Sequence, residues 1–320
     1  MLTYVLFVIG FVLLIKGADY LVEGASSIAK RYQLSELVIG LTIVSFGTSM
    51  PELIVNLLAS FEGSAELAIG NVFGSNIANV LLILGFSAIV RPLPIQRSIY
   101  FTEIPISLVA TFMVGFLANA NLFTDGQGLS LSRFDGGMLL LFFALFMFYI
   151  AVIARSKDET ENEEEEIALL PMGKSLLLIG AGVLGLFVGG KWIVDGAVVI
   201  ASALGFSETF IGLTVVAIGT SLPELVTSVV AARKGKADIA VGNVIGSNIF
   251  NILWILGISA LIRPLPFDIV NNMDILTVIF SSTMLLFAVI VGRKPQISRA
   301  TGYLFVFLYI AYLVYLVQRG

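Results

Sequence analysis

Cysteine and histidine are both absent from this 320-residue sequence, and charged residues are scarce at 12%. Without cysteine there are no disulfides, thiol nucleophiles or thiolate metal ligands. Without histidine there is no Ser-His catalytic pair and no imidazole metal ligand. A soluble domain carries about 25% charged residues. These absences argue against an enzyme and leave oxygen atoms as the ligands for any metal site.

Apolar residues are abundant instead, at 58% of the chain. They gather in runs long enough to cross a hydrocarbon core of roughly 30 Å as helices rising about 1.5 Å per residue. We therefore predict an all-α, multi-pass protein of the cell (cytoplasmic) membrane in contact with the lipid bilayer. The ten predicted transmembrane helices cover residues 2–24, 37–60, 67–90, 99–119, 136–154, 173–203, 209–232, 239–262, 273–291 and 301–318.

One stretch, residues 155–172, breaks the apolar pattern with a run of glutamates. A block of like charge repels itself and stays solvated, so a cytoplasmic linker is favoured over a cation-attracting or regulatory segment. The linker divides the chain into a first five-helix repeat, 1–154, and a second, 173–320.

The two halves are related by a fixed offset of 172 residues. Without gaps, 33 of the 56 positions from Ile39 to Pro94 are identical to Ile211–Pro266. Five helices per half is an odd number, so the second half must enter the membrane in the opposite direction. This is an inverted-topology repeat, an architecture of secondary transporters.

Basic residues predict the orientation. With the N-terminus outside, thirteen lysines and arginines fall on the cytoplasmic side and three on the outside. The positive-inside rule therefore predicts that both termini lie outside and that the acidic linker lies in the cytoplasm.

The motif Gly-Thr-Ser-x-Pro-Glu occurs at 47–52 and again at 219–224. Each copy lies near the middle of a predicted span, where an unpaired carboxylate is costly. Pro51 removes one helical N–H and should break the helix, exposing carbonyl oxygens beside Glu52 and Thr48. Such hard oxygen atoms suit Na⁺ or Ca²⁺. The alternative is a proline kink with Glu52 and Glu224 in internal ion pairs.

A second doubled motif, Gly-Asn-x-x-Gly-Ser-Asn, begins at residues 70 and 242. Three residues after each copy comes a further asparagine, so that the two segments are 70–79 and 242–251. Ser75 and Asn79 share a helix face, as do Ser247 and Asn251, because each pair is four residues apart. For these four residues we favour ion ligation over the alternative, in which they form interhelical hydrogen bonds. The other asparagines of the motif are interpreted as interhelical hydrogen-bonding residues.

Charges in the first and sixth predicted spans have helical pairing distances. We interpret Lys16 with Asp19, and Lys191 with Asp195, as peripheral ion pairs. Glu36 follows Ser35 at a predicted helix start, where a negative charge is favourable.

Together these motifs resemble the calcium/cation antiporter superfamily, the sodium/calcium exchangers and their prokaryotic relatives, over nearly the whole chain. The resemblance implies an antiporter with four central ion sites and no cofactor, in which Glu52 and Glu224 bind Ca²⁺ or Na⁺ alternately. It also implies oxygen ligands from the other repeated positions. The implied metal-binding residues are Glu52, Glu224, Thr48, Thr220, Ser49, Ser221, Ser75, Ser247, Asn79, Asn251 and the carbonyls of Ser45 and Ala217.

Two positions depart from the family pattern. Some relatives have aspartate where this chain has Asn251, and Asn56 occupies a position where serine is usual. Na⁺/Ca²⁺ antiport by alternating access is the leading interpretation, with H⁺/Ca²⁺ exchange and, more remotely, a cation channel as alternatives. The expected partners are these ions and lipid, without nucleic acid or an obligate protein partner.

Overall fold

The computed structural model describes residues 2–122, 128–155, 169–204, 217–292 and 294–319 of the chain. Helices account for nearly all of them. The helices before the linker are α1 (Leu2–Tyr32), α2 (Glu36–Ile39), α3 (Ser45–Thr48), α4 (Met50–Glu62), α5 (Ala65–Ile77), α6 (Gly85–Val90), α7 (Ile104–Ala118) and α8 (Arg133–Ile153). Those after it are α9 (Met172–Ala203), α11 (Ala217–Thr220), α12 (Leu222–Arg233), α13 (Ala237–Ile249), α14 (Leu256–Ile262), α15 (Asn272–Val291) and α16 (Arg299–Arg319).

Short irregular helices and strands connect these elements. Wider π-helical turns form η1 (Gly40–Val44), η2 (Ala78–Leu84), η3 (Ile99–Glu103) and η6 (Phe250–Ile255), and 3₁₀ turns form η4 (Ala120–Leu122) and η7 (Ile269–Asn271). Two antiparallel strand pairs join distant loops: β1 (Leu93–Pro94) with β4 (Gln296–Ile297), and β2 (Leu129–Leu131) with β3 (Leu265–Phe267).

Membrane-spanning helices dominate the described part of the chain. Eight are long and apolar enough to cross a bilayer, and the bent pair Glu36–Thr48 and Met50–Glu62 makes a ninth. The predicted span 209–232 begins within 205–216, which lies outside the described residues, so the count of ten stays a prediction. The all-helical membrane fold is as the composition indicates. The first span is longer than predicted, reaching Tyr32 rather than residue 24.

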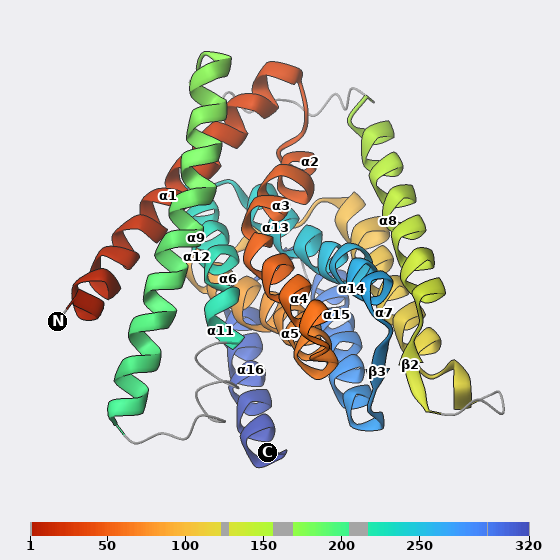
Figure 1. Ribbon diagram of the computed structural model, residues 1–320. Helices are drawn as coiled ribbons and strands as arrows, with labels where there is room; N and C mark the ends of the chain where they lie inside the picture. Colours follow the sequence, from red (N-terminus) through yellow and green to blue (C-terminus); the bar gives the residue numbers. More distant parts are fainter. Residues whose placement is uncertain (1, 123–127, 156–168, 205–216, 293, 320) are drawn as a thin grey trace.

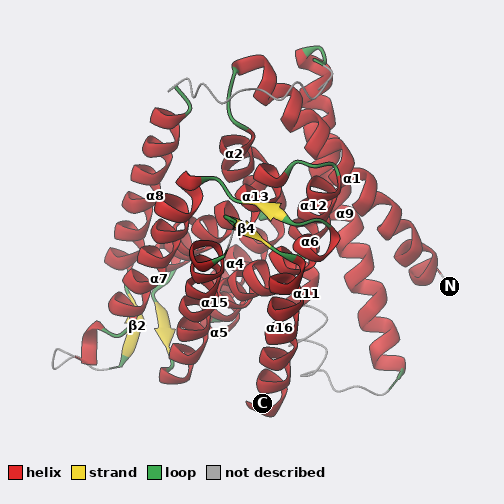
Figure 2. Cartoon of the chain, turned by 180° about the vertical axis from the view of Figure 1, so that it is seen from behind, coloured by secondary structure: helices red, strands yellow, loops and turns green. Residues whose placement is uncertain are grey.

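Two spans form the centre of the molecule. The helices Ala65–Val90 and Ala237–Ile262 each have 78% of their apolar window buried, whereas that of α16 is 22% buried. Figure 1 shows α1 and α9 side by side at one edge and α8 at the opposite edge, and the view from behind in Figure 2 agrees. The bent helix α3–α4 lies between these edges, beside the central spans.

Close backbone approach joins α1 to α9. A Cβ atom added at Gly17 would lie 2.8 Å from the carbonyl oxygen of Gly182, and one added at Gly182 would lie 2.7 Å from the amide nitrogen of Leu21. Only glycine fits at such a contact, so the two helices pack on each other's backbones as small residues allow in membranes.

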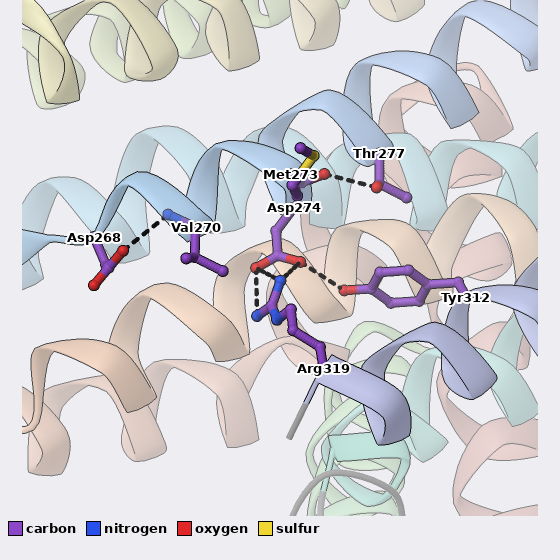
Figure 3. A network of polar contacts seen from close by, with 7 residues as sticks. All are labelled: Asp268, Val270, Met273, Asp274, Thr277, Tyr312 and Arg319. Carbon is purple, nitrogen blue, oxygen red and sulfur yellow. Dashed lines mark hydrogen bonds and ion pairs between the residues drawn. The ribbon is translucent and has the colours of Figure 1, made fainter.

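A polar network fastens the last helix to α15. Asp274, which is 5% exposed, accepts hydrogen bonds from the Arg319 guanidinium at 3.0–3.2 Å and from the Tyr312 hydroxyl at 3.2 Å (Figure 3). The arginine neutralises a carboxylate that would be costly to bury alone.

Candidate cation site

The helix carrying the first motif is broken at Ser49. That residue has φ −82° and ψ 8°, and the helices on either side of it are bent by 49°. Pro51 has no N–H to offer the carbonyl of Gly47, which is why the helix cannot continue here. The second motif breaks in the same way at Ser221, with φ −88° and ψ 6°. The helix break predicted from Pro51 is confirmed, and the second copy of the motif has the same break.

The break places Glu52 and Glu224 in the protein interior, each 1% exposed. Each carboxylate is bound by a serine from the other copy of the motif. Ser49 Oγ donates to Glu224 Oε1 at 2.8 Å, and Ser221 Oγ donates to Glu52 Oε1 at 3.3 Å. The two repeated motifs are therefore interleaved. Among the described residues, no basic side chain forms an ion pair with either glutamate, as the kink alternative would require.

The serines of the second motif lie beside those of the first. Ser49 Oγ is 2.9 Å from Ser247 Oγ, and Ser221 Oγ is 3.3 Å from Ser75 Oγ. All four hydroxyl groups belong to buried residues. The structure thus gathers the four predicted serines in one hydroxyl-rich layer next to the glutamates.

The threonines reach across to asparagines of the opposite half. Thr48 Oγ1 donates to Asn243 Oδ1 at 2.9 Å, and Thr220 Oγ1 lies 3.5 Å from Asn71 Oδ1. Asn71 Nδ2 donates to Asn56 Oδ1 at 2.6 Å. Asn56, which departs from the family pattern, is therefore linked to Thr220 through Asn71.

Asn79 and Asn251 are each oriented by an asparagine of the other half. Asn79 Nδ2 donates to Asn248 Oδ1 at 2.9 Å, and Asn251 Nδ2 donates to Asn76 Oδ1 at 3.0 Å. These bonds engage the amide nitrogens of Asn79 and Asn251 and leave the amide oxygens available for another partner. Asn76 and Asn248 act as the hydrogen-bonding residues that the sequence indicated.

Four buried oxygen atoms of the predicted site residues have no hydrogen-bond donor within the described part of the chain. They are Oε2 of Glu52, Oε2 of Glu224, Oδ1 of Asn79 and Oδ1 of Asn251. A buried acceptor without a partner is costly, the more so when it carries charge. Two carboxylate and two amide oxygens are hard ligands of the type that Ca²⁺ and Na⁺ prefer. Chemically, the arrangement can bind a cation.

The Ser45 carbonyl, one of the two predicted carbonyl ligands, already accepts two hydrogen bonds. The Ser45 carbonyl accepts bonds from the Ser49 amide at 3.0 Å and the Thr48 hydroxyl at 3.3 Å. Ala217 is the first residue of α11, directly after the undescribed residues 205–216. The roles predicted for these two carbonyls as ion ligands stay predictions.

The peripheral charges agree with the prediction at one place and not at another. Lys191 pairs with Asp195 at 2.9 Å, as predicted. The predicted pair of Lys16 and Asp19 is wrong, because Asp19 faces α12 and pairs with Lys234 at 2.9 Å. Spacing along one helix cannot reveal a cation on a neighbouring helix. Glu36 lies in the first turn of α2, capped by Ser35, as predicted.

Sequence reasoning missed two buried carboxylates, Asp274, which pairs with Arg319, and Glu103. Glu103 is fully buried and accepts a hydrogen bond from the Tyr149 hydroxyl at 2.9 Å. It lies at the end of η3, outside both doubled motifs. The sequence feature that could have identified Glu103 as buried is its position just inside the predicted apolar span 99–119.

Comparison with known proteins places the chain among exchangers. The sodium/calcium exchanger protein family matches residues 2–152 and 174–318. Relatives include the inner membrane protein YrbG of Escherichia coli, 39% identical over 95% of this chain and 93% of that protein. The sodium/calcium exchanger MaX1 of Methanosarcina acetivorans is 33% identical over 98% of both. A solved structure of the sodium-calcium exchanger NCX_Mj aligns with a TM-score of 0.82, at 32% identity and 98% coverage of both chains.

Proposed function

Since the chain belongs to the sodium/calcium exchanger family, a family of membrane ion antiporters, we propose that it exchanges Na⁺ for Ca²⁺ by alternating access. The observation that carries the proposal is the set of four unpaired buried oxygens on Glu52, Glu224, Asn79 and Asn251. Two carboxylates supply the charge that balances one Ca²⁺, and the amide oxygens add neutral ligands.

The same residues suit Na⁺ when Ca²⁺ is absent. The hydroxyl layer of Ser49, Ser221, Ser75 and Ser247 surrounds the two carboxylates, and hydroxyl and carbonyl oxygens are ligands for a monovalent ion. We assign these serines, with the carbonyls of Ser45 and Ala217, to Na⁺. Thr48 and Thr220 complete the Ca²⁺ site beside the glutamates.

The proposal includes ten helices in two inverted halves, with 155–172 as the connection. Reciprocal contacts support a twofold relation. The bond from Asn79 to Asn248 has its counterpart from Asn251 to Asn76, and each residue is replaced by the one 172 positions away. The family also matches the chain in two stretches that end and begin at the linker. Under the positive-inside rule both termini lie outside.

Ca²⁺ uptake into vesicles tests the coupling ion. The purified protein is reconstituted, and Ca²⁺ entry is followed under an imposed outward Na⁺ gradient or an outward H⁺ gradient at equal membrane potential. Uptake that depends on the Na⁺ gradient and disappears when the Na⁺ gradient is collapsed is the expected result. Uptake driven by H⁺ and indifferent to Na⁺ would assign the protein to H⁺/Ca²⁺ exchange instead.

A further inference from the structure

A hollow of about 800 Å³ lies beside the broken helix, between η1, α3, α4, α8, α9 and η6. Its walls are apolar side chains and glycine backbone. The hydroxyl on this wall belongs to Thr42 and is already bonded to the Val38 carbonyl at 2.6 Å. Among the described residues, one side-chain donor of the lining has no hydrogen-bond partner, Nε1 of Trp254, and this atom is itself buried.

The hollow opens on the surface that faces lipid. Among its lining residues, Leu184 is 62% exposed and Phe46 is 47% exposed. Its depth is that of the cation site, because Gly47 and Phe250 of the lining adjoin Thr48 and Asn251 in the chain. The hollow is therefore continuous with the protein's interface to the hydrocarbon core. Water is absent at that depth and does not fill an apolar cavity.

Aromatic rings packed on one another form one wall of the hollow. Phe250 packs edge-to-face on Phe46 at 5.2 Å and on Phe143 at 5.4 Å, and Trp254 lies 5.0 Å from Phe143. On α9, a Cβ atom added at Gly180 would meet nothing within 4 Å. Close packing is the rule in protein interiors, so a persistent gap of this size calls for an occupant.

The repeat does not require this hollow. The offset of 172 places Ala78 and Leu82 where the second half has Phe250 and Trp254. Phe250 and Trp254 thus have no aromatic counterparts in the first half, so these two members of the wall are not imposed by the ion site that both halves share.

We propose that the hollow binds one acyl chain of a membrane phospholipid, which enters between α8 and α9 and lies against the aromatic wall. The chain supplies the dispersion contacts that the lining would otherwise lack. Its headgroup stays at the bilayer surface, because the hollow lies at the depth of the cation site and its walls are almost wholly apolar.

The tryptophans allow a direct test. The protein has two, Trp192 and Trp254, so Trp192→Phe leaves Trp254 in the hollow as the single reporter. The variant is reconstituted into phosphatidylcholine vesicles whose acyl chains are brominated near their middle, because bromine quenches indole fluorescence on contact. We expect a marked loss of Trp254 emission compared with unbrominated vesicles.

A plug separates binding in the hollow from general lipid contact. Gly180→Phe, added to Trp192→Phe, fills the hollow and should abolish most of the quenching. Gly173→Phe is the matched control, because it also lies on α9 with nothing within 4 Å of an added Cβ and does not line the hollow. Gly180→Leu serves if the phenylalanine variant does not accumulate in the membrane. Equal quenching in plug and control, or none in Trp192→Phe alone, would overturn the proposal.

Discussion

At the scale of single residues, Glu52 and Glu224 carry the charge of the proposed site. Replacing either by glutamine removes one of two carboxylates, and losing one partner of a buried charged contact costs roughly 2–5 kcal/mol. A loss of that size weakens binding by about 30-fold or more. We therefore expect Na⁺-driven Ca²⁺ flux in Glu52→Gln and in Glu224→Gln to fall to near background at normal membrane abundance.

Glu103→Gln is the matched control for this prediction, since Glu103 is an equally buried carboxylate that contacts Tyr149. Asp19→Asn, a partly exposed partner of Lys234, is a second. Both should retain most of the flux. Substantial exchange in either Glu52→Gln or Glu224→Gln, or an equal loss in Glu103→Gln, would remove the two glutamates from the centre of the mechanism.

Asn251→Asp tests the unpaired amide oxygens. Asn251 now donates to Asn76 Oδ1 at 3.0 Å, so a carboxylate there would set oxygen against oxygen unless it held a proton. It would also be a third acid beside two others, and like charges favour protonation. Flux in the variant should thus decline at a higher pH than in the parent as the medium is acidified. Asn79→Asp should behave alike, and superimposable pH profiles would make both asparagines packing residues.

Much of the residue-level arrangement could be predicted from the sequence, because depth in a span and spacing of four residues identify which side chains share a face. The hydrogen-bond partners of these side chains could not be predicted. Nothing in the spacing says that Ser49 donates to Glu224 or that Thr48 faces Asn243, since these pairs are 175 and 195 residues apart. The same limitation explains the wrong partner for Asp19.

At the scale of elements, the break at Ser49 is the feature on which the site depends. Pro51→Ala restores an N–H for the Gly47 carbonyl and removes a residue that costs about 3 kcal/mol inside a helix. A straighter helix would carry Glu52 away from Ser221. We expect a strongly reduced Ca²⁺ flux with an unchanged or higher melting temperature in detergent.

Pro105→Ala is the control for helix geometry, because Pro105 lies in the first turn of α7 and outside the doubled motifs. It should leave the flux largely intact. A Pro51→Ala protein that exchanges like the parent would show that the break does not position the site.

The sequence predicted the helix breaks but not the π-helical turns. Proline has an unambiguous effect on the backbone, so the break at Ser49 followed from Pro51. The wider turns of η2 and η6 contain no comparable signal. They begin at Ala78 and Phe250, one residue before Asn79 and Asn251, and such turns are common at functional sites.

At the scale of the whole molecule, the prediction to test is the orientation in the membrane, with both termini outside. The chain has no cysteine, so single cysteines can be introduced without a background. Asn162→Cys in the acidic linker should react with a membrane-impermeant maleimide only after the cells are opened. Asp268→Cys, exposed beyond β3, should react in intact cells. The reverse pattern would place both termini in the cytoplasm.

The central claim is that one location, with only two carboxylates, binds either Ca²⁺ or Na⁺. Two negative charges cannot balance Ca²⁺ and several Na⁺ together, so binding of one ion must weaken binding of the other by linkage. The most direct measurement is calorimetric titration of the purified protein with Ca²⁺ at increasing Na⁺ and constant ionic strength. The account predicts that the apparent Ca²⁺ dissociation constant rises steadily with Na⁺ concentration. A Ca²⁺ affinity that stays constant in high Na⁺ would contradict it and indicate separate sites.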